Sequence, residues 1–150
     1  MKDFIVKTFA TVFGLGYMPV APGTFGTFGA AILWYFTLRG MDPLSYVVFL
    51  FIITIFSCYI AWLAEKVYGQ KDSQRIVIDE LCGYLLTVAF SGTVLLGLVG
   101  IIFFRLFDIL KPWPIKKFEK LPGGIGVVAD DLMAGVYGFL ALRIVSYFIG

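Results

Sequence analysis

The chain has 150 residues, of which 60% are hydrophobic and only 15% are charged, with a formal net charge of +2. Soluble domains are usually about 45–50% apolar and about 25% charged, so the composition predicts an integral membrane protein and disfavours a soluble protein with an unusually apolar core. The small net charge, with no basic run interleaved with aromatics in a polar domain, excludes a nucleic-acid partner.

The N-terminal segment, residues 4–18, is apolar apart from Lys7 and Thr11, which are one helical turn apart. This pattern predicts an interfacial helix lying against the rest of the protein, with a further membrane crossing as the alternative. The segment is not typical of a signal peptide, because Lys7 interrupts its apolar region and Asp3 precedes it.

Four further apolar stretches are candidates for membrane helices: residues 24–38, 45–64, 76–110 and 132–150. A bilayer core of about 30 Å requires about 20 apolar residues in a helix. Residues 45–64 meet this requirement without a charge, and residues 132–150 nearly meet it, with Arg143 as the exception. Residues 76–110 are too long for one crossing and are interrupted at Ser91, Gly92 and Thr93, which predicts two helices joined by a tight turn.

The positions of the basic residues indicate the orientation of the helices. If residues 76–90 and 93–110 form a hairpin, most basic residues fall on one side: Lys2, Lys7, Lys66, Lys71, Arg75, Arg105, Lys111, Lys116, Lys117 and Lys120. Only Arg39 and Arg143 lie elsewhere, and such an imbalance is typical of a cytoplasmic face. A single crossing over residues 84–107 would instead put the basic segments 65–75 and 111–120 on opposite sides of the membrane. We therefore favour the hairpin.

The predicted architecture is therefore an all-α, polytopic integral membrane helical bundle. It has about four to five membrane helices, as counted from the apolar stretches, plus an N-terminal interfacial helix. We expect residues 1–150 to form a single membrane-embedded domain.

In this topology five acids lie at the cytoplasmic ends of helices. Two begin one helix, one ends the next, and two begin the last: Asp79, Glu80, Asp108, Asp130 and Asp131. Carboxylates at the edge of hydrocarbon are costly unless they are paired or bound to a cation. Helix capping is the alternative for the four acids at helix starts, but a negative charge is unfavourable near a helix C-terminus, so capping does not explain Asp108. An all-oxygen cluster in a chain without histidine suits a hard cation such as Mg²⁺.

Basic partners lie among these acids. Arg105, Asp108 and Lys111 follow one another at a three-residue spacing, so they share one face of a helix. Pro112 is expected to end that helix. One interpretation is a phosphate clamp, with Arg105 binding bidentately and Lys111 as a point charge. The other is a snorkelling interfacial anchor beside Trp113.

Residues 22–27, PGTFGT, precede an apolar helix, where exposed backbone N–H groups can hold an anion, although glycines in membrane helices more often allow close packing.

The residue types present in the chain exclude several phosphatase mechanisms. Without histidine there is neither a phosphohistidine nor a Ser-His-Asp triad, and neither Cys58 nor Cys82 has the following arginine that a cysteine phosphatase needs. No aspartate has a second aspartate two residues on, as aspartyl-phosphate phosphatases of the haloacid type require. The mechanism that remains is metal-assisted attack on the phosphate by water or by a carboxylate.

Four motifs in this order resemble the phosphatidylglycerophosphatase A family, and the resemblance covers essentially the whole chain: PGTFGT at 22–27, IVIDELCG at 76–83, FRLFDILKPWPI at 104–115 and GGIGVVADDLMAG at 123–135. The resemblance implies a Mg²⁺-dependent, multi-pass enzyme of the bacterial cytoplasmic membrane with its active site on the cytoplasmic side. It would release inorganic phosphate from phosphatidylglycerophosphate and leave phosphatidylglycerol among the membrane lipids.

On this resemblance, metal ligands and the general base are expected among the five acids Asp79, Glu80, Asp108, Asp130 and Asp131. Arg105 and Lys111 would neutralise the phosphoryl oxygens, and Thr24 and Thr27 would hold the glycerol or the phosphate.

Two alternative functions fit the sequence less well. A lipid phosphotransferase would need an Asp-Gly and an Ala-Arg between its acids, and this longer pattern is absent from the sequence. A small membrane carrier that uses acids as an ion relay predicts acids near the bilayer midplane and an internal repeat, whereas the acids here are expected at helix ends.

Overall fold

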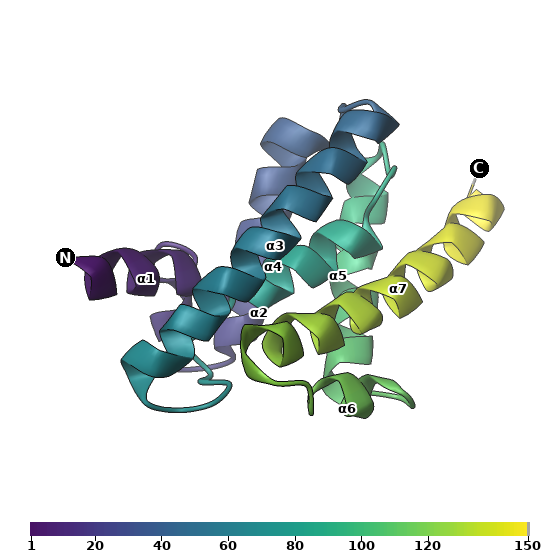
Figure 1. Cartoon of the computed structure of the whole chain (residues 1–150). Coiled ribbons are helices and arrows are strands. Elements are labelled where there is room, and N and C mark those ends of the chain that lie inside the picture. The colour runs from purple at the N-terminus through teal and green to yellow at the C-terminus, as the bar shows by residue number, and fades with distance from the viewer. Residues whose placement is uncertain (150) are drawn as a thin grey trace.

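The computed structural model describes residues 1–149, and over this range every regular element is a helix, which confirms the predicted all-α class (Figure 1). The elements are α1 (Lys2–Ala10), η1 (Leu15–Tyr17), α2 (Pro22–Leu33), η2 (Trp34–Leu38), α3 (Pro43–Tyr68), α4 (Ile78–Thr87), α5 (Val94–Leu110), α6 (Ile115–Phe118) and α7 (Gly123–Ile149).

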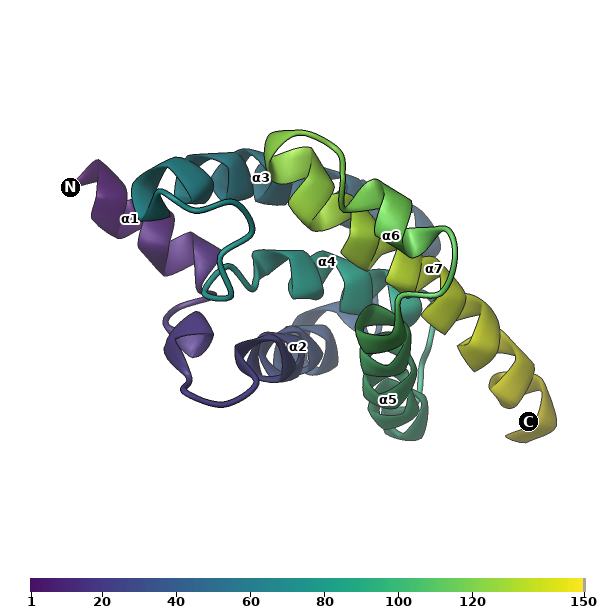
Figure 2. The same ribbon diagram turned by 90° about the horizontal axis from the view of Figure 1, so that it is seen from below.

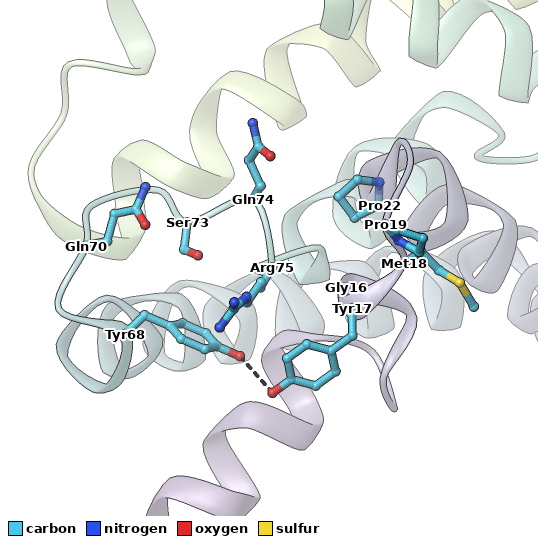
Figure 3. Close-up of a pocket in the computed structure, with 10 residues that line it drawn as sticks. All are labelled: Gly16, Tyr17, Met18, Pro19, Pro22, Tyr68, Gln70, Ser73, Gln74 and Arg75. Atoms are coloured by element: carbon cyan, nitrogen blue, oxygen red, sulfur yellow. Dashed lines mark hydrogen bonds between the residues drawn. The ribbon is translucent and has the colours of Figure 1, made fainter.

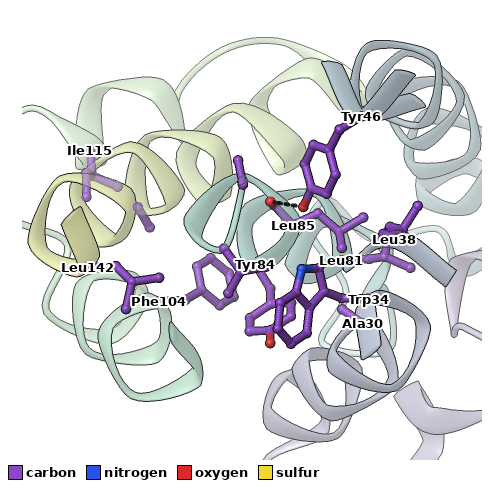
Figure 4. Packing of buried hydrophobic residues seen from close by; sticks show 13 residues of the cluster. Ala30, Trp34, Leu38, Tyr46, Leu81, Tyr84, Leu85, Phe104, Ile115 and Leu142 are labelled. Carbon is purple, nitrogen blue, oxygen red and sulfur yellow. Dashed lines mark hydrogen bonds between the residues drawn. The ribbon is translucent and has the colours of Figure 1, made fainter. Parts of the chain in front are cut away.

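The short helix α4 lies at the centre of the bundle and packs against α2, α3, α5 and α7. Seen from below, α3 and α7 run along one side of α4, and α2 and α5 lie on the other (Figure 2). Its side chains Tyr84 and Leu85 are fully buried beside Phe104 of α5 and Trp34 of η2 (Figure 4). The Leu85 carbonyl also accepts a hydrogen bond of 2.6 Å from the Tyr46 hydroxyl of α3. The residues that precede α4 are therefore held in the middle of the fold.

Two helices, α3 and α7, are long and apolar enough to cross a membrane by length and composition. Only 22% of the apolar window of each is buried, whereas the core helix of a soluble protein would be mostly buried. Large apolar side chains of α3 instead cover the outer surface: Val47, Val48, Phe51, Ile52, Ile55 and Tyr59. The two helices that meet the criterion are fewer than the predicted four to five, because α2 has 12 residues and α5 has 17.

The prediction of two helices within residues 76–110, separated near Ser91 to Thr93, is confirmed. Helix α4 ends at Thr87, and α5 begins after Thr93, whose hydroxyl accepts a hydrogen bond of 3.3 Å from the Leu96 N–H. Helix α5 ends at Leu110 as predicted, because Lys111 takes a left-handed conformation with φ of 42° directly before Pro112.

The N-terminal helix is shorter than the predicted segment 4–18. It ends at Ala10, because Val12 and Phe13 have positive φ angles of 46° and 57° and break the helix. Thr11 is fully buried, so it is not part of an exposed polar stripe. Its hydroxyl donates to the Lys7 carbonyl at 2.7 Å and accepts from the Gly14 N–H at 3.0 Å.

The prediction that the last helix begins at Asp130 and Asp131 is wrong. Helix α7 begins at Gly123, so Asp130 and Asp131 lie about two turns inside it and do not cap its N-terminus. The glycines of this stretch fit a close helix contact, since a Cβ added at Gly124 would collide with the Cys58 carbonyl of α3. The acids consequently face the interior of the fold and are buried.

Helices α4 and α7 also cross with their backbones in contact. A Cβ added at Gly83 would lie 2.6 Å from the Asp131 carbonyl oxygen, and one added at Gly135 would lie 2.5 Å from the Gly83 carbonyl oxygen. Neither position can accept a side chain without moving a helix.

Replacing Gly135 with alanine is therefore expected to lower the free energy of unfolding by about 1–3 kcal/mol, because the added methyl group forces α4 and α7 apart. Thermal unfolding in detergent measures the change. Gly92→Ala is the matched control, since a Cβ there meets nothing within 4 Å. Equal unfolding midpoints for the two variants would show that the crossing is not tight.

Candidate active site

The structure brings all the acids and bases singled out in the sequence into one cavity of about 350 Å³. Three helices, one of them through its C-cap Lys111, and the loop before α4 contribute its charged lining residues: Asp72, Asp79, Glu80, Arg105, Asp108, Lys111, Asp130 and Asp131. The first residues of α4, the last turn of α5 and the second turn of α7 meet there, with the start of α2 closing one side through Pro22 and Gly23. Helix ends from distant parts of the chain thus build a single charged site.

Three of the carboxylates form the centre of the cavity. One oxygen each of Asp79, Glu80 and Asp131 lies within 4.8 Å of the other two. The structure leaves one buried oxygen of each without a hydrogen-bond partner: Oδ1 of Asp79, Oε2 of Glu80 and Oδ2 of Asp131. Buried, unpartnered like charges at this spacing repel one another unless a cation is bound between them. The donor set therefore fits a hard divalent cation, whose ligands are oxygen atoms.

The remaining two acids are paired with the bases. The Arg105 guanidinium donates to Asp108 at 2.5 Å and also lies 3.8 Å from a Glu80 oxygen. The Lys111 ammonium donates to Asp130 at 2.8 Å. Both bases thus stand beside the three-carboxylate centre, and the Nε of Arg105 is buried without a partner.

Lys111 keeps its charge in this setting. Burial alone would lower the pKa of its ammonium, but the hydrogen bond to Asp130 and the negative charges of Asp130 and Glu119 outweigh burial and raise that pKa above its ordinary value. A cation fixed at this position can pair with a second anion that enters the cavity.

The start of α2 approaches the cavity through Gly23. A Cβ added there would collide with the Glu80 carboxylate and lie 3.1 Å from an Arg105 nitrogen, so a larger residue would displace these two side chains of the site. The first turn of a helix carries backbone N–H groups without helical partners, and its dipole favours anions. This wall can therefore assist the binding of a phosphate.

The two threonines predicted to bind substrate lie on α2 but do not line the cavity. The Thr27 hydroxyl is fully buried and donates to the Gly23 carbonyl at 2.9 Å, while Thr24 is half-buried. Their role in binding stays a prediction.

Sequence reasoning missed the loop between α3 and α4. Asp72, Ser73 and Gln74 line the cavity opposite α2. The available signal was the short polar run KDSQR, residues 71–75, which stands between two apolar stretches directly before the IVIDE segment.

Comparisons with known proteins match nearly the whole chain. A family model described as phosphatidylglycerophosphatase A matches residues 8–146. A Bacteroides thetaiotaomicron protein provisionally named a phosphatidylinositol-3-phosphatase is 34% identical, over 99% of this chain and 98% of the relative.

Two further relatives carry the name phosphatidylglycerophosphatase A. The one from Haemophilus influenzae is 31% identical, over 96% of this chain and 90% of its own length. The one from Escherichia coli is 34% identical, over 94% of this chain and 81% of its own length. No solved structure gives a significant match.

Proposed function

The chain belongs to the phosphatidylglycerophosphatase A family, and from this membership we propose that it hydrolyses the terminal phosphomonoester of phosphatidylglycerophosphate to phosphatidylglycerol and inorganic phosphate. The observation that carries the proposal is the cavity in which three converging carboxylates, each with one buried oxygen that has no hydrogen-bond partner, lie beside Arg105 and Lys111. A centre that can hold a cation next to two fixed positive charges is suited to a phosphate ester. Nothing in the comparisons favours an ion carrier.

Within this proposal Asp79, Glu80 and Asp131 hold Mg²⁺, since one oxygen of each lies close to the other two and one buried oxygen of each has no hydrogen-bond partner. When bound, the ion would supply Lewis-acid polarisation of the phosphoryl oxygens and a lower pKa for a coordinated water. Hard carboxylate ligands and the absence of histidine from the sequence agree with this choice of ion.

Arg105 and Lys111 bind the phosphoryl oxygens and stabilise the charge that develops on them. Asp108 and Asp130 are positioning residues, because each holds one of these cations by a hydrogen bond of 2.5 and 2.8 Å respectively. A water oxygen attacks the phosphorus while the bond from phosphorus to the glycerol oxygen breaks. A cavity carboxylate takes the proton of the water, and the leaving alkoxide is protonated in turn.

The proposal also includes a multi-pass arrangement in a bacterial cytoplasmic membrane, with α5 and the continuous α2–η2 segment crossing beside α3 and α7 and with α1 at the interface. Two features support it. The relatives come from bacteria, and the outer faces of α3 and α5 are apolar. The cavity lies at the bundle end that carries most of the basic residues, which favours the cytoplasmic side. A lipid could then present its head group there while its acyl chains stay in the bilayer.

Phosphate release by the purified protein in uncharged detergent micelles tests this function. We expect turnover of phosphatidylglycerophosphate to exceed that of phosphatidylinositol 3-phosphate, the substrate named for the Bacteroides relative. An ion carrier would instead release no phosphate from either lipid and would conduct ions in vesicles. Preference for the inositol lipid would assign this chain to the other substrate.

A further inference from the structure

A second cavity of about 480 Å³ adjoins the acid-lined cavity (Figure 3). Its walls are residues 16–19 around η1 and the end of α3 with the loop that follows it. Three residues, Pro22, Ser73 and Gln74, line both cavities. A ligand that occupies the acid-lined cavity can therefore extend past these residues into the second one.

The second cavity contains a cation, Arg75, without an acidic partner. Among residues 1–149 the ion pairs all involve either Arg105 or Lys111. The Arg75 guanidinium lies 5.9 Å from the centre of the Tyr17 ring and 5.7 Å from that of Tyr68. The two tyrosine hydroxyls are 3.2 Å apart and hydrogen-bonded to each other, so the rings form one aromatic support for the guanidinium (Figure 3).

The position of Arg75 is fixed by its backbone. A Cβ added at Gly16 would collide with the Arg75 carbonyl, so η1 and the loop are in direct contact. Next to it, the Val77 N–H donates to the Ala10 carbonyl at 2.9 Å, and the Ile76 N–H donates to the Ser73 carbonyl at 2.8 Å. The side chain itself is exposed and can meet a ligand.

We propose that the second cavity binds the phosphodiester of the lipid substrate and that Arg75 is its cationic contact. This inference rests on the proposed function and adds a separate binding site for the phosphodiester of that substrate. The phosphomonoester lies in the acid-lined cavity, and the glycerol between the two phosphates passes Ser73 and Gln74, which both cavities share.

Charge supports this division of the substrate. The acid-lined cavity holds six carboxylate side chains but only two bases, so even with a divalent cation bound it has little attraction left for a second phosphate. Arg75 supplies a separate positive charge, and an arginine fork can donate two hydrogen bonds to a phosphodiester. A lipid without the phosphodiester, such as phosphatidic acid, would gain nothing from Arg75.

The test replaces Arg75 with glutamine and uses two inhibitors, one for each phosphate position. Short-chain phosphatidylglycerol carries only the phosphodiester and reports on the second cavity, whereas inorganic phosphate reports on the acid-lined cavity. We expect KM for phosphatidylglycerophosphate and the inhibition constant of short-chain phosphatidylglycerol each to rise about tenfold to a hundredfold, which corresponds to the loss of a charged hydrogen bond. The kcat and the inhibition constant of inorganic phosphate are expected to change less than about threefold, since neither depends on the phosphodiester. Arg75→Lys is expected to recover part of the loss.

The matched control is Arg39→Gln, which removes an arginine that lies 4.9 Å from the Tyr35 ring, beyond the end of η2. This change is expected to alter none of the constants. An Arg75→Gln protein in which both inhibitors weaken equally, or in which neither weakens, overturns the inference.

A second measurement needs no variant and compares two inhibitors of the wild-type protein. The inference is also overturned if short-chain phosphatidylglycerol inhibits no better than uncharged dioctanoylglycerol. Failure of the proposed function looks different, because the wild-type protein would then release no phosphate from phosphatidylglycerophosphate at all.

Discussion

Replacing Asp131 with asparagine is expected to lower kcat for phosphate release from phosphatidylglycerophosphate by about a hundredfold to a thousandfold, the scale for the loss of one preorganised electrostatic group. Asparagine keeps the shape of the side chain but removes its negative charge. The Asp131 carboxylate has one buried oxygen without a hydrogen-bond partner, and one of its oxygens lies within 4.8 Å of oxygens of Asp79 and Glu80. Steady-state phosphate release in detergent micelles measures the effect.

The same variant separates a functional role from a structural one. In metal-free buffer its unfolding midpoint should equal or exceed that of the wild type, because the substitution removes one of three close, buried negative charges. Asp3→Asn, at an exposed position in the first turn of α1, is the control and should change neither quantity. Near-normal turnover of folded Asp131→Asn protein would remove Asp131 from the site.

Removal of divalent cations is expected to reduce the activity of the wild-type protein at least about a hundredfold, and added Mg²⁺ should restore it. The physical reason is that the three carboxylates at the centre repel one another and the incoming phosphate when no cation neutralises them. Dialysis against a chelator, followed by titration with Mg²⁺ during the phosphate-release assay, measures the dependence.

A binding measurement makes this prediction independent of activity. Mg²⁺ at a hundred times its dissociation constant should stabilise the wild-type fold by about 2.7 kcal/mol, because a ligand that binds only the folded state adds its binding free energy to stability. Asp79→Asn and Asp131→Asn proteins should show a much smaller shift in unfolding midpoint. Full activity in excess chelator, or an equal shift in all three proteins, would contradict a metal centre at these residues.

The sequence predicted the parts of the site that depend on local spacing. Arg105 and Asp108 are three residues apart on one helix, so their side chains had to be neighbours, and they form an ion pair. Ser91 and Gly92 separate two apolar runs, and the structure has a connection between α4 and α5 there. Local rules of helix geometry were sufficient for both.

The sequence could not predict the features that depend on contacts between distant segments. The last helix is expected from sequence to begin at Asp130 and Asp131, since the stretch GGIGVV before them has low helix propensity, but packing of Gly124 against α3 makes that stretch helical. The contribution of Asp72 to the cavity likewise follows from how the loop after α3 folds back over α4, which no local pattern encodes. The cavity around Arg75 also needs η1 and that loop to meet.

The contact between Gly83 and Gly135 has a consequence for the choice of ion. Each glycine lies one helical turn after an acid of the centre, Asp79 on α4 and Asp131 on α7. The span between these two carboxylates is therefore set by main chain resting on main chain, which yields far less than side-chain packing would. Mg²⁺ and Ca²⁺, whose oxygens stand at about 2.0–2.1 Å and about 2.3–2.6 Å, need different separations of these two carboxylates. The helices would have to move against each other to provide both separations, so we expect the centre to discriminate between ions by size.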